Sequence, residues 1–154
     1  MRGRILALGL GLALASASAA ATLAATGGGS EDLGLDGVQV ISGTASTATG
    51  SVTLSGSITC SQDIEVFVFA QLSQAVGRFN TIRGWGQTAN PIACDAAVGS
   101  VRFALAVFPE FGKFAGGSAV VDAGAEAVVC DEFDCVSDDA HYGPAGLKLR
   151  GGRG

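Results

Sequence analysis

Apolar and polar residues alternate with a period of two over much of the sequence after residue 37. In SVTLSGSITC, residues 51–60, Val, Leu, Ile and Cys fall at alternate positions, and serines and threonines fill the positions between them. IEVFVFAQL, residues 64–72, continues the pattern. Because successive side chains of a β-strand point to opposite faces, both stretches are predicted strands with at least one buried face. The short SQD segment between them predicts a hairpin.

Five further stretches have a similar character. Together they predict about seven strands separated by turns rich in Gly, Ser, Asp and Asn, with no convincing helix beyond the N-terminus. This pattern favours an all-β fold, an antiparallel immunoglobulin-like β-sandwich stapled by disulfides, and leaves a small closed barrel as the alternative. The five stretches are VQVIS (38–42), GRFNTIRGWGQ (77–87), SVRFALAVF (100–108), GSAVVDAGAEAVVC (117–130) and AGLKLR (145–150).

The N-terminus has the pattern of a secretory signal peptide. Two arginines precede an apolar run over residues 5–14, and Ala17-Ser18-Ala19 is a small-residue cleavage signal. The run is shorter than the roughly 20 apolar residues that a membrane-spanning helix needs. We therefore expect a signal peptide at 1–19, with a second candidate cleavage position at residue 25, and a secreted mature protein.

Three parts are expected in the mature chain: a flexible lead-in at 20–37, a sandwich domain at 38–150 and a disordered tail at 151–154. No cysteine precedes Cys60, so we expect no lipid anchor at the cleavage point. The net charge is -5 and becomes -7 once the two arginines of the signal peptide are removed. An acidic domain repels nucleic acid and anionic lipid, so the expected partner is an unknown protein, glycan or small molecule.

Four cysteines in an exported protein predict two disulfides, for which three pairings can be drawn. We favour Cys60–Cys94 and Cys130–Cys135, because the second pair is close in sequence and the first would join distant parts of a sheet. A zinc site would need closer cysteine pairs with further ligands, whereas His141 is the single histidine of the chain. We expect neither a metal nor a cofactor.

The segment VVCDEFDCVSDDAHYGP, residues 128–144, combines two cysteines, five acidic residues and the histidine. Carboxylates suit calcium, but their spacing does not match an EF-hand and the turn glycine is missing. A carboxylate-pair hydrolase takes its acids from separate elements, and His141 lacks a matching serine motif. We therefore interpret the segment as a stapled turn between the last two strands, without catalytic residues. Its acidic residues are Asp131, Glu132, Asp134, Asp138 and Asp139.

Four side chains are candidates for ligand contact: Trp85, Arg83, Phe67 and Phe69. Trp85 lies between two glycines, which would allow the indole to be displayed on a surface, and tryptophan and arginine are common binding hot spots. The favoured interpretation is that this single tryptophan packs in the core. Phe67 and Phe69 lie opposite the buried valines of their strand, so either both faces are buried or an aromatic patch is exposed.

Several motifs together resemble a family of small secreted actinobacterial proteins with an immunoglobulin-like sandwich: SVTLSGSITC, FAQLSQAVGRF, IRGWG, ACD, GKFAGGSAVVDA and CDEFDC. This resemblance implies the sandwich fold and supplies no catalytic residue. CDEFDC followed by SDDAHYGPAGLKL is more weakly similar to the neocarzinostatin-type enediyne apoproteins, in which a similar short disulfide closes one side of a chromophore cleft. In those proteins the first cysteine pair is close in sequence, unlike Cys60 and Cys94.

The sequence thus favours a secreted, non-enzymatic binding or cell-envelope-associated module of unknown ligand. An extracellular small-molecule carrier is the alternative, motivated by the enediyne likeness and by Phe67 and Phe69. A secreted hydrolase that uses Asp138, Asp139 and His141 is the least favoured function.

Overall fold

A computed structural model of the protein describes residues 32–130 and 132–151. The predicted signal peptide at 1–19, most of the predicted lead-in and Asp131 lie outside the described residues, as do residues 152–154 of the predicted tail. The first strand begins at Leu35, three residues before the predicted start of the domain.

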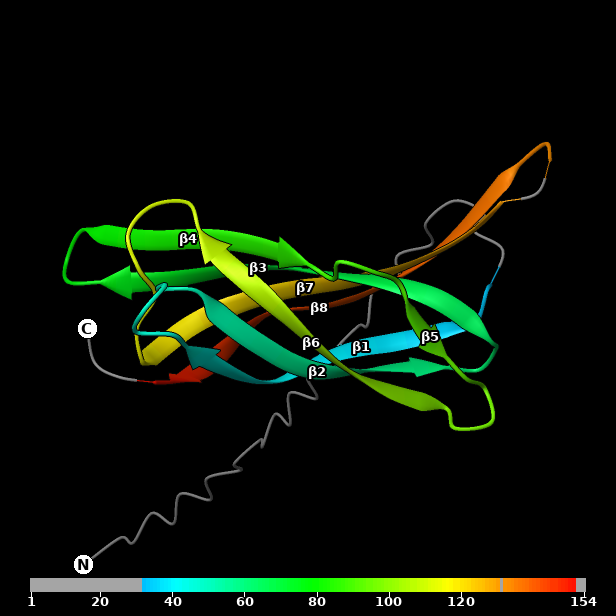
Figure 1. Ribbon diagram of the computed structural model, residues 1–154, viewed down its shortest axis with the longest axis horizontal. Helices are drawn as coiled ribbons and strands as arrows, with labels where there is room; N and C mark the ends of the chain where they lie inside the picture. Colours follow the sequence, from blue (N-terminus) through cyan, green and yellow to red (C-terminus); the bar gives the residue numbers. More distant parts are fainter. Residues whose placement is uncertain (1–31, 131, 152–154) are drawn as a thin grey trace, which may run out of the picture.

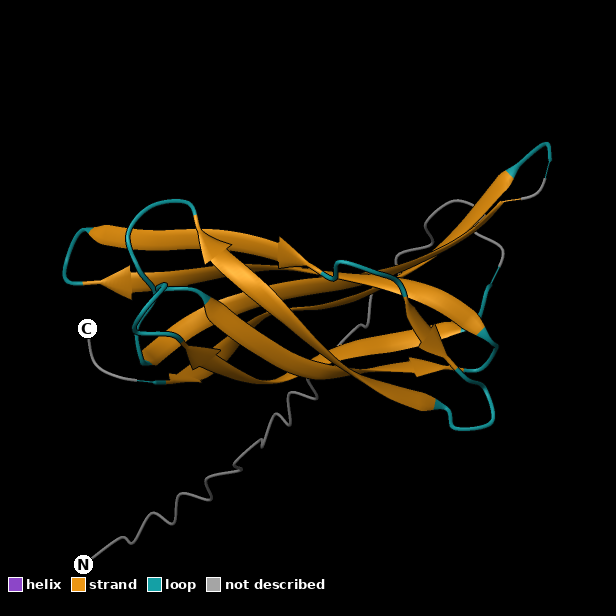
Figure 2. Cartoon of the chain, in the orientation of Figure 1, coloured by secondary structure: helices purple, strands orange, loops and turns teal. Residues whose placement is uncertain are grey.

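The described residues form eight β-strands and no helix (Figure 2). The all-β prediction is therefore confirmed. Seven of the strands correspond to the seven predicted stretches, and the three-residue β5 was not predicted. The strands are β1 (Leu35–Ala45), β2 (Val52–Cys60), β3 (Ile64–Val76), β4 (Asn80–Gln87), β5 (Ile92–Cys94), β6 (Ser100–Pro109), β7 (Gly117–Cys130) and β8 (Cys135–Arg150).

The sheet closes into a seven-stranded barrel (Figure 1). The strands follow the order β4-β6-β2-β1-β8-β7-β3, and β3 pairs again with β4, while β5 pairs with the start of β3. The predicted open immunoglobulin-like sandwich is therefore wrong, and the closed barrel is the architecture. Two short seams join what would be the two sheets of a sandwich: β4 pairs with β6, and β1 runs parallel to β8.

Glycines on β4 explain why the β4–β6 seam can close. A Cβ atom at Gly86 would overlap the backbone carbonyl oxygen of Ala106, and one at Gly84 would overlap that of Phe108. Because neither position carries a side chain, the backbone of β4 lies directly against β6. The sequence 77–87 therefore combines strand formation with the close contact that turns a sandwich into a barrel.

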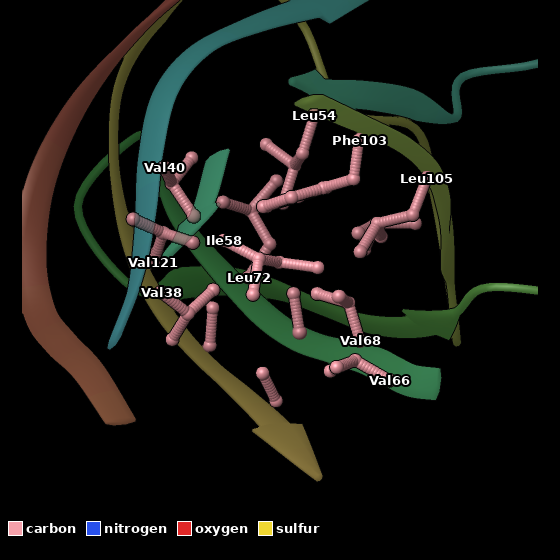
Figure 3. Packing of buried hydrophobic residues seen from close by; sticks show 14 of the residues in the cluster. Val38, Val40, Leu54, Ile58, Val66, Val68, Leu72, Phe103, Leu105 and Val121 are labelled. Atoms are coloured by element: carbon pink, nitrogen blue, oxygen red, sulfur yellow. The ribbon is translucent and has the colours of Figure 1, made fainter. Parts of the chain in front are cut away.

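Alternation along the strands fills the interior with apolar side chains (Figure 3). The alternate apolar residues of β2 and β3 are buried, and so are those of β7 as far as Ala127. The alternation of β7 predicts that Val129 also faces inward, and this is wrong: Val129 is exposed, because β7 there extends beyond its partner β3. The segment 122–129, which could be mistaken for a helix, is part of β7. Core residues that surround the barrel axis include Val40, Leu54, Ile58, Val66, Val68, Leu72, Phe103, Leu105 and Val121.

The predicted hairpin between β2 and β3 is wrong. β2 pairs with β1 and β6, whereas β3 pairs with β4, β5 and β7, so the SQD link crosses from one side of the barrel to the other. SQD contains no glycine, which a three-residue hairpin loop needs at its left-handed position. Instead, the N–H of Ser61 donates to the carbonyl of Gly34, and Asp63 Oδ1 accepts the N–H of Ala96.

The interpretation of residues 128–144 as a turn is also wrong for most of their length. β7 extends to Cys130 and β8 begins at Cys135, so the turn itself is short. The partner strand β3 reaches only as far as Ala127 on β7, and the stapled hairpin projects beyond the barrel (Figure 1). The side chains of β8 lack a strong apolar face, and the pattern of its first half therefore resembles a loop.

Both favoured disulfides are present. Cys60 and Cys94 join β2 to β5 across a Cα–Cα distance of 6.3 Å, and Cys130 and Cys135 close the projecting hairpin with a Cα–Cα distance of 4.0 Å. The described chain contains no free cysteine. Two disulfides fit a protein of an oxidising, extracellular compartment.

Candidate functional site

The four predicted contact residues lie on the outer surface of the barrel, on β3 and β4. Trp85 is 56% exposed, so its interpretation as a core residue is wrong. Phe67 and Phe69 are each 45% exposed. The alternation of β3 and β4 turns their small and aliphatic residues inward, which leaves these aromatic rings outside. β3 therefore has one buried face and one face with exposed aromatic side chains, rather than two buried faces.

Strand register places polar side chains beside Trp85. Trp85 is paired with Gln71 of β3, and Gln71 is paired with Asp122 of β7. One step along the same face, Arg83 is paired with Ser73. Directly paired residues on one face have Cβ atoms about 4.5–5.5 Å apart. Three strands therefore bring one aromatic and several polar side chains together.

These side chains line a depression of about 430 Å³, which we call the outer groove. Glu110 joins the groove from the end of β6, where its backbone N–H donates to the carbonyl oxygen of Arg83 at 2.8 Å. Gly84 permits this approach of β6 to β4. The polar and aromatic residues of the groove are Gln71, Ser73, Arg83, Trp85, Glu110 and Asp122.

A smaller hollow of about 260 Å³ also borders Trp85. It is lined by Gly86, Gln87, Ala106 and Phe108, and Trp85 contributes to it as well as to the outer groove. Trp85 therefore borders both the outer groove and a more apolar hollow. Phe108, which is paired with Trp85 across the β4–β6 seam, lines the same hollow.

Phe69 and Phe67 lie further along β3 and do not line the outer groove. Phe69 packs over Gly124 of β7, where a Cβ atom would overlap the phenyl ring. Phe67 is paired with Glu126. Of the four predicted contact residues, the structure brings Trp85 and Arg83 together in one groove and places the two phenylalanines beside it.

Asp122 has a defined partner at the edge of the groove. His141 of β8 lies with Nε2 2.9 Å from Asp122 Oδ1, and both side chains are about half exposed. An exposed pair of this kind contributes at most about 1 kcal/mol to stability, so its main effect is to orient the carboxylate.

Two acidic residues of the 128–144 segment, Asp138 and Asp139, have other partners than His141. Asp138 Oδ2 accepts the backbone N–H groups of Leu33 and Leu35, at 3.2 and 3.0 Å, and so ties the start of β1 to β8. Asp139 is paired with Glu126 on the outer face. Within residues 32–130 and 132–151, no three His, Cys, Asp or Glu side chains are grouped as a metal site would require.

Gln71, Ser73, Glu110 and Asp122 were not predicted as site residues. Strand alternation already places Gln71 and Asp122 on the outer faces of β3 and β7, so part of the signal was present. The alternation does not predict that β3 pairs with both β4 and β7, which is what brings these side chains together. Glu110 depends on the β4–β6 seam, which no local pattern indicates.

The chain matches no protein-family model, and no similar protein was found among the curated proteins. The two family resemblances therefore stay predictions, apart from the sandwich fold that they imply, which the barrel contradicts. In the described part of the chain, nothing helical has the length and hydrophobicity that a membrane crossing requires.

Proposed function

We propose that the protein is a secreted, non-enzymatic binding module that holds its ligand in the outer groove. The observation that carries the proposal is the half-exposed indole of Trp85 among Gln71, Arg83, Glu110 and Asp122. Leaving a large aromatic side chain in water forgoes about 1.5–3 kcal/mol of burial free energy, so an exposed ring with polar neighbours is typical of a recognition surface.

Export is the second part of the proposal. It is supported by the signal-peptide pattern of residues 1–19 and by two disulfides, which persist in oxidising compartments. The acidic net charge favours a partner other than nucleic acid or an anionic membrane. The non-enzymatic part is supported by the contacts of two of the hydrolase candidates: Asp138 accepts backbone N–H groups of Leu33 and Leu35, and His141 pairs with Asp122.

The carrier alternative is less well supported. A carrier of the enediyne type would need an apolar cleft that holds an aromatic chromophore. Core side chains such as Leu54, Ile58 and Leu72 occupy the space between the strands (Figure 3). Phe67 and Phe69, which motivated the carrier, lie on the outer surface rather than in a cleft.

Retention on cell-envelope material tests the proposed function. The mature protein, the variant Trp85→Ala and the control Phe79→Ala are incubated with envelope fractions of cells that express the protein, and the bound fraction is measured. Phe79 is 94% exposed and lies outside the outer groove, so it matches the loss of an aromatic side chain. We expect saturable retention that Trp85→Ala removes and Phe79→Ala keeps. Retention that both variants keep, or no retention, would contradict a binding module that uses this groove.

A further inference from the structure

We propose that the ligand of the outer groove is a neutral glycan, one pyranose ring of which stacks on Trp85. The inference rests on the proposed function and adds the chemical class of the ligand. Five features of the groove carry it: the aromatic wall, the mixed hydrogen-bonding groups, the charge, the fixed backbone and the size.

The aromatic wall matches one face of a sugar ring. The face of an indole is electron-rich, because aromatic rings carry a quadrupole with a negative face. The C–H groups on one face of a pyranose are weakly positive and apolar. Trp85 is half exposed and lines the outer groove, so the indole is accessible to a flat, weakly polar ring that enters the groove.

The other groove side chains match the hydroxyl groups around such a ring. Each sugar hydroxyl both donates and accepts hydrogen bonds. Asp122 and Glu110 offer carboxylate acceptors, and Arg83 and Gln71 offer donors. Hydrogen bonds to ionised groups are about twice as strong as neutral ones, which suits a ligand that must give up many contacts with water.

The charge of the groove favours a neutral glycan over an acidic one. Two carboxylates, Glu110 and Asp122, face a single guanidinium, that of Arg83. A uronic acid or sulfated sugar would bring a further negative charge into this setting and would be repelled. The net charge of the whole chain, -5, acts in the same direction.

The backbone of the groove is fixed before the ligand arrives. Trp85, Arg83 and Gln71 extend from paired strands, the backbone N–H of Glu110 donates to the carbonyl oxygen of Arg83, and the side chain of Asp122 is paired with His141. A backbone that is already in place loses little conformational freedom on binding. Such a groove can bind a solvated ligand despite its small contact area.

The size of the groove favours a short saccharide over a folded protein. Its 430 Å³ lie within the range of about 300–1,000 Å³ that is usual for small-ligand sites. A stable protein interface would need about 800 Å² from each partner with an apolar centre, whereas Arg83, Glu110 and Asp122 put three charged side chains in this groove. A lipid chain would need an apolar lining.

The test uses defined polysaccharides. The mature protein is mixed with insoluble cellulose, chitin, xylan and mannan, and with alginate gel as an acidic comparator, and the bound fraction is measured. Soluble oligosaccharides of any polysaccharide that binds are then titrated while the fluorescence of Trp85, the single tryptophan of the chain, is recorded. We expect saturable binding to at least one neutral polysaccharide, little binding to alginate, and a change in Trp85 emission.

Matched variants connect the binding to the groove. Trp85→Ala should weaken binding by about tenfold or more, and Asp122→Asn by several-fold, because each removes a contact with the sugar. The controls Phe79→Ala and Glu126→Gln change similar side chains outside the groove, the second on the same strand as Asp122. Both controls should bind as the unchanged protein does.

The outcomes separate the ligand class from the proposed function. Binding to none of the neutral polysaccharides overturns the glycan proposal, and so does equal loss in the groove variants and the controls. The envelope fraction is also treated with periodate, which cleaves sugar diols, or with protease. These treatments distinguish a failure of the glycan proposal from a failure of the proposed binding function. Trp85-dependent retention that protease removes and periodate leaves intact would overturn the glycan and keep the binding module. Retention that periodate removes and protease leaves intact supports the glycan. No Trp85-dependent retention on the untreated fraction, together with binding to none of the polysaccharides, would overturn both.

Discussion

The side chain of Gln74 forms two hydrogen bonds with the backbone of Ala115. Its Nε2 donates to the carbonyl oxygen at 2.8 Å, and its Oε1 accepts the N–H at 3.0 Å. Gln74 is buried at the end of β3, and Ala115 belongs to the link between β6 and β7. The side-chain amide of Gln74 thus gives the backbone of Ala115 the two hydrogen bonds that a neighbouring strand would otherwise provide. It holds the loop next to Phe114, which is buried in the core.

Replacing Gln74 by leucine should lower the free energy of unfolding by about 1–3 kcal/mol, because the backbone groups of Ala115 lose their partners in a partly buried position. Gln87→Leu, at an exposed position of β4, is the control and should stay within about 0.5 kcal/mol of the unchanged protein. Urea unfolding measures both. Equal losses in the two variants would show that the Gln74 contact is not specific.

Gly86→Ala should destabilise the barrel by about 1–3 kcal/mol, since its Cβ atom would overlap the Ala106 carbonyl and the β4–β6 seam would have to open. Gly146→Ala is the matched control, because no atom lies within 4 Å of the added Cβ. The control should be neutral or slightly stabilising, by less than about 1 kcal/mol. Thermal unfolding of both variants checks the difference. A stable Gly86→Ala protein would contradict the role of glycine in closing the barrel.

These glycines show why the class of the fold was predictable and its closure was not. Alternation identifies the inward face of a strand such as β2, because burial and side-chain direction share a period of two. Alternation carries no information on which strands pair, and a flattened barrel has the same inward faces as a sandwich. Whether the strands form a sandwich or a closed barrel depends on two residue pairings at the β4–β6 seam and two at the β1–β8 seam.

Some residues of the candidate site are likewise predictable from the sequence, and others depend on strand pairing. Trp85 and Arg83 were predicted because aromatic and basic residues stand out on a glycine-rich strand. Asp122 looked like one polar residue in an apolar strand, and its place in the groove follows from the register that pairs it with Gln71. The first half of β8 was mistaken for a loop because its partly buried positions include Asp138 and Ala140, and neither signals a core-facing strand.

Asp138 provides a test of the acidic segment. Asp138→Ala should lower the free energy of unfolding by about 1–3 kcal/mol, since the N–H groups of Leu33 and Leu35 lose their acceptor. Asp139→Ala removes a neighbouring exposed carboxylate and should change stability by less than about 0.5 kcal/mol. Melting curves with EDTA and with added calcium should coincide for the unchanged protein. A melting temperature that rises with calcium and loses this response in both variants would instead indicate a metal site.

The two disulfides should differ in their contribution to stability. Replacing Cys60 and Cys94 by serine releases a loop with a sequence separation of 34, worth about 4 kcal/mol on the chain-entropy model, and puts hydroxyl groups where both sulfur-bearing side chains are buried.

Replacing Cys130 and Cys135 releases a separation of only 5, which that model values at about 2 kcal/mol. This disulfide closes the part of the hairpin beyond Ala127, where β7 is no longer paired with β3. Local opening of the hairpin there does not disturb the pairing of the barrel strands. Urea unfolding of the two double variants should therefore give the larger loss for Cys60–Cys94, with the hairpin variant still folded. If the hairpin variant unfolds first, the tip must make contacts that support the barrel, and the projecting hairpin would be part of the folding unit.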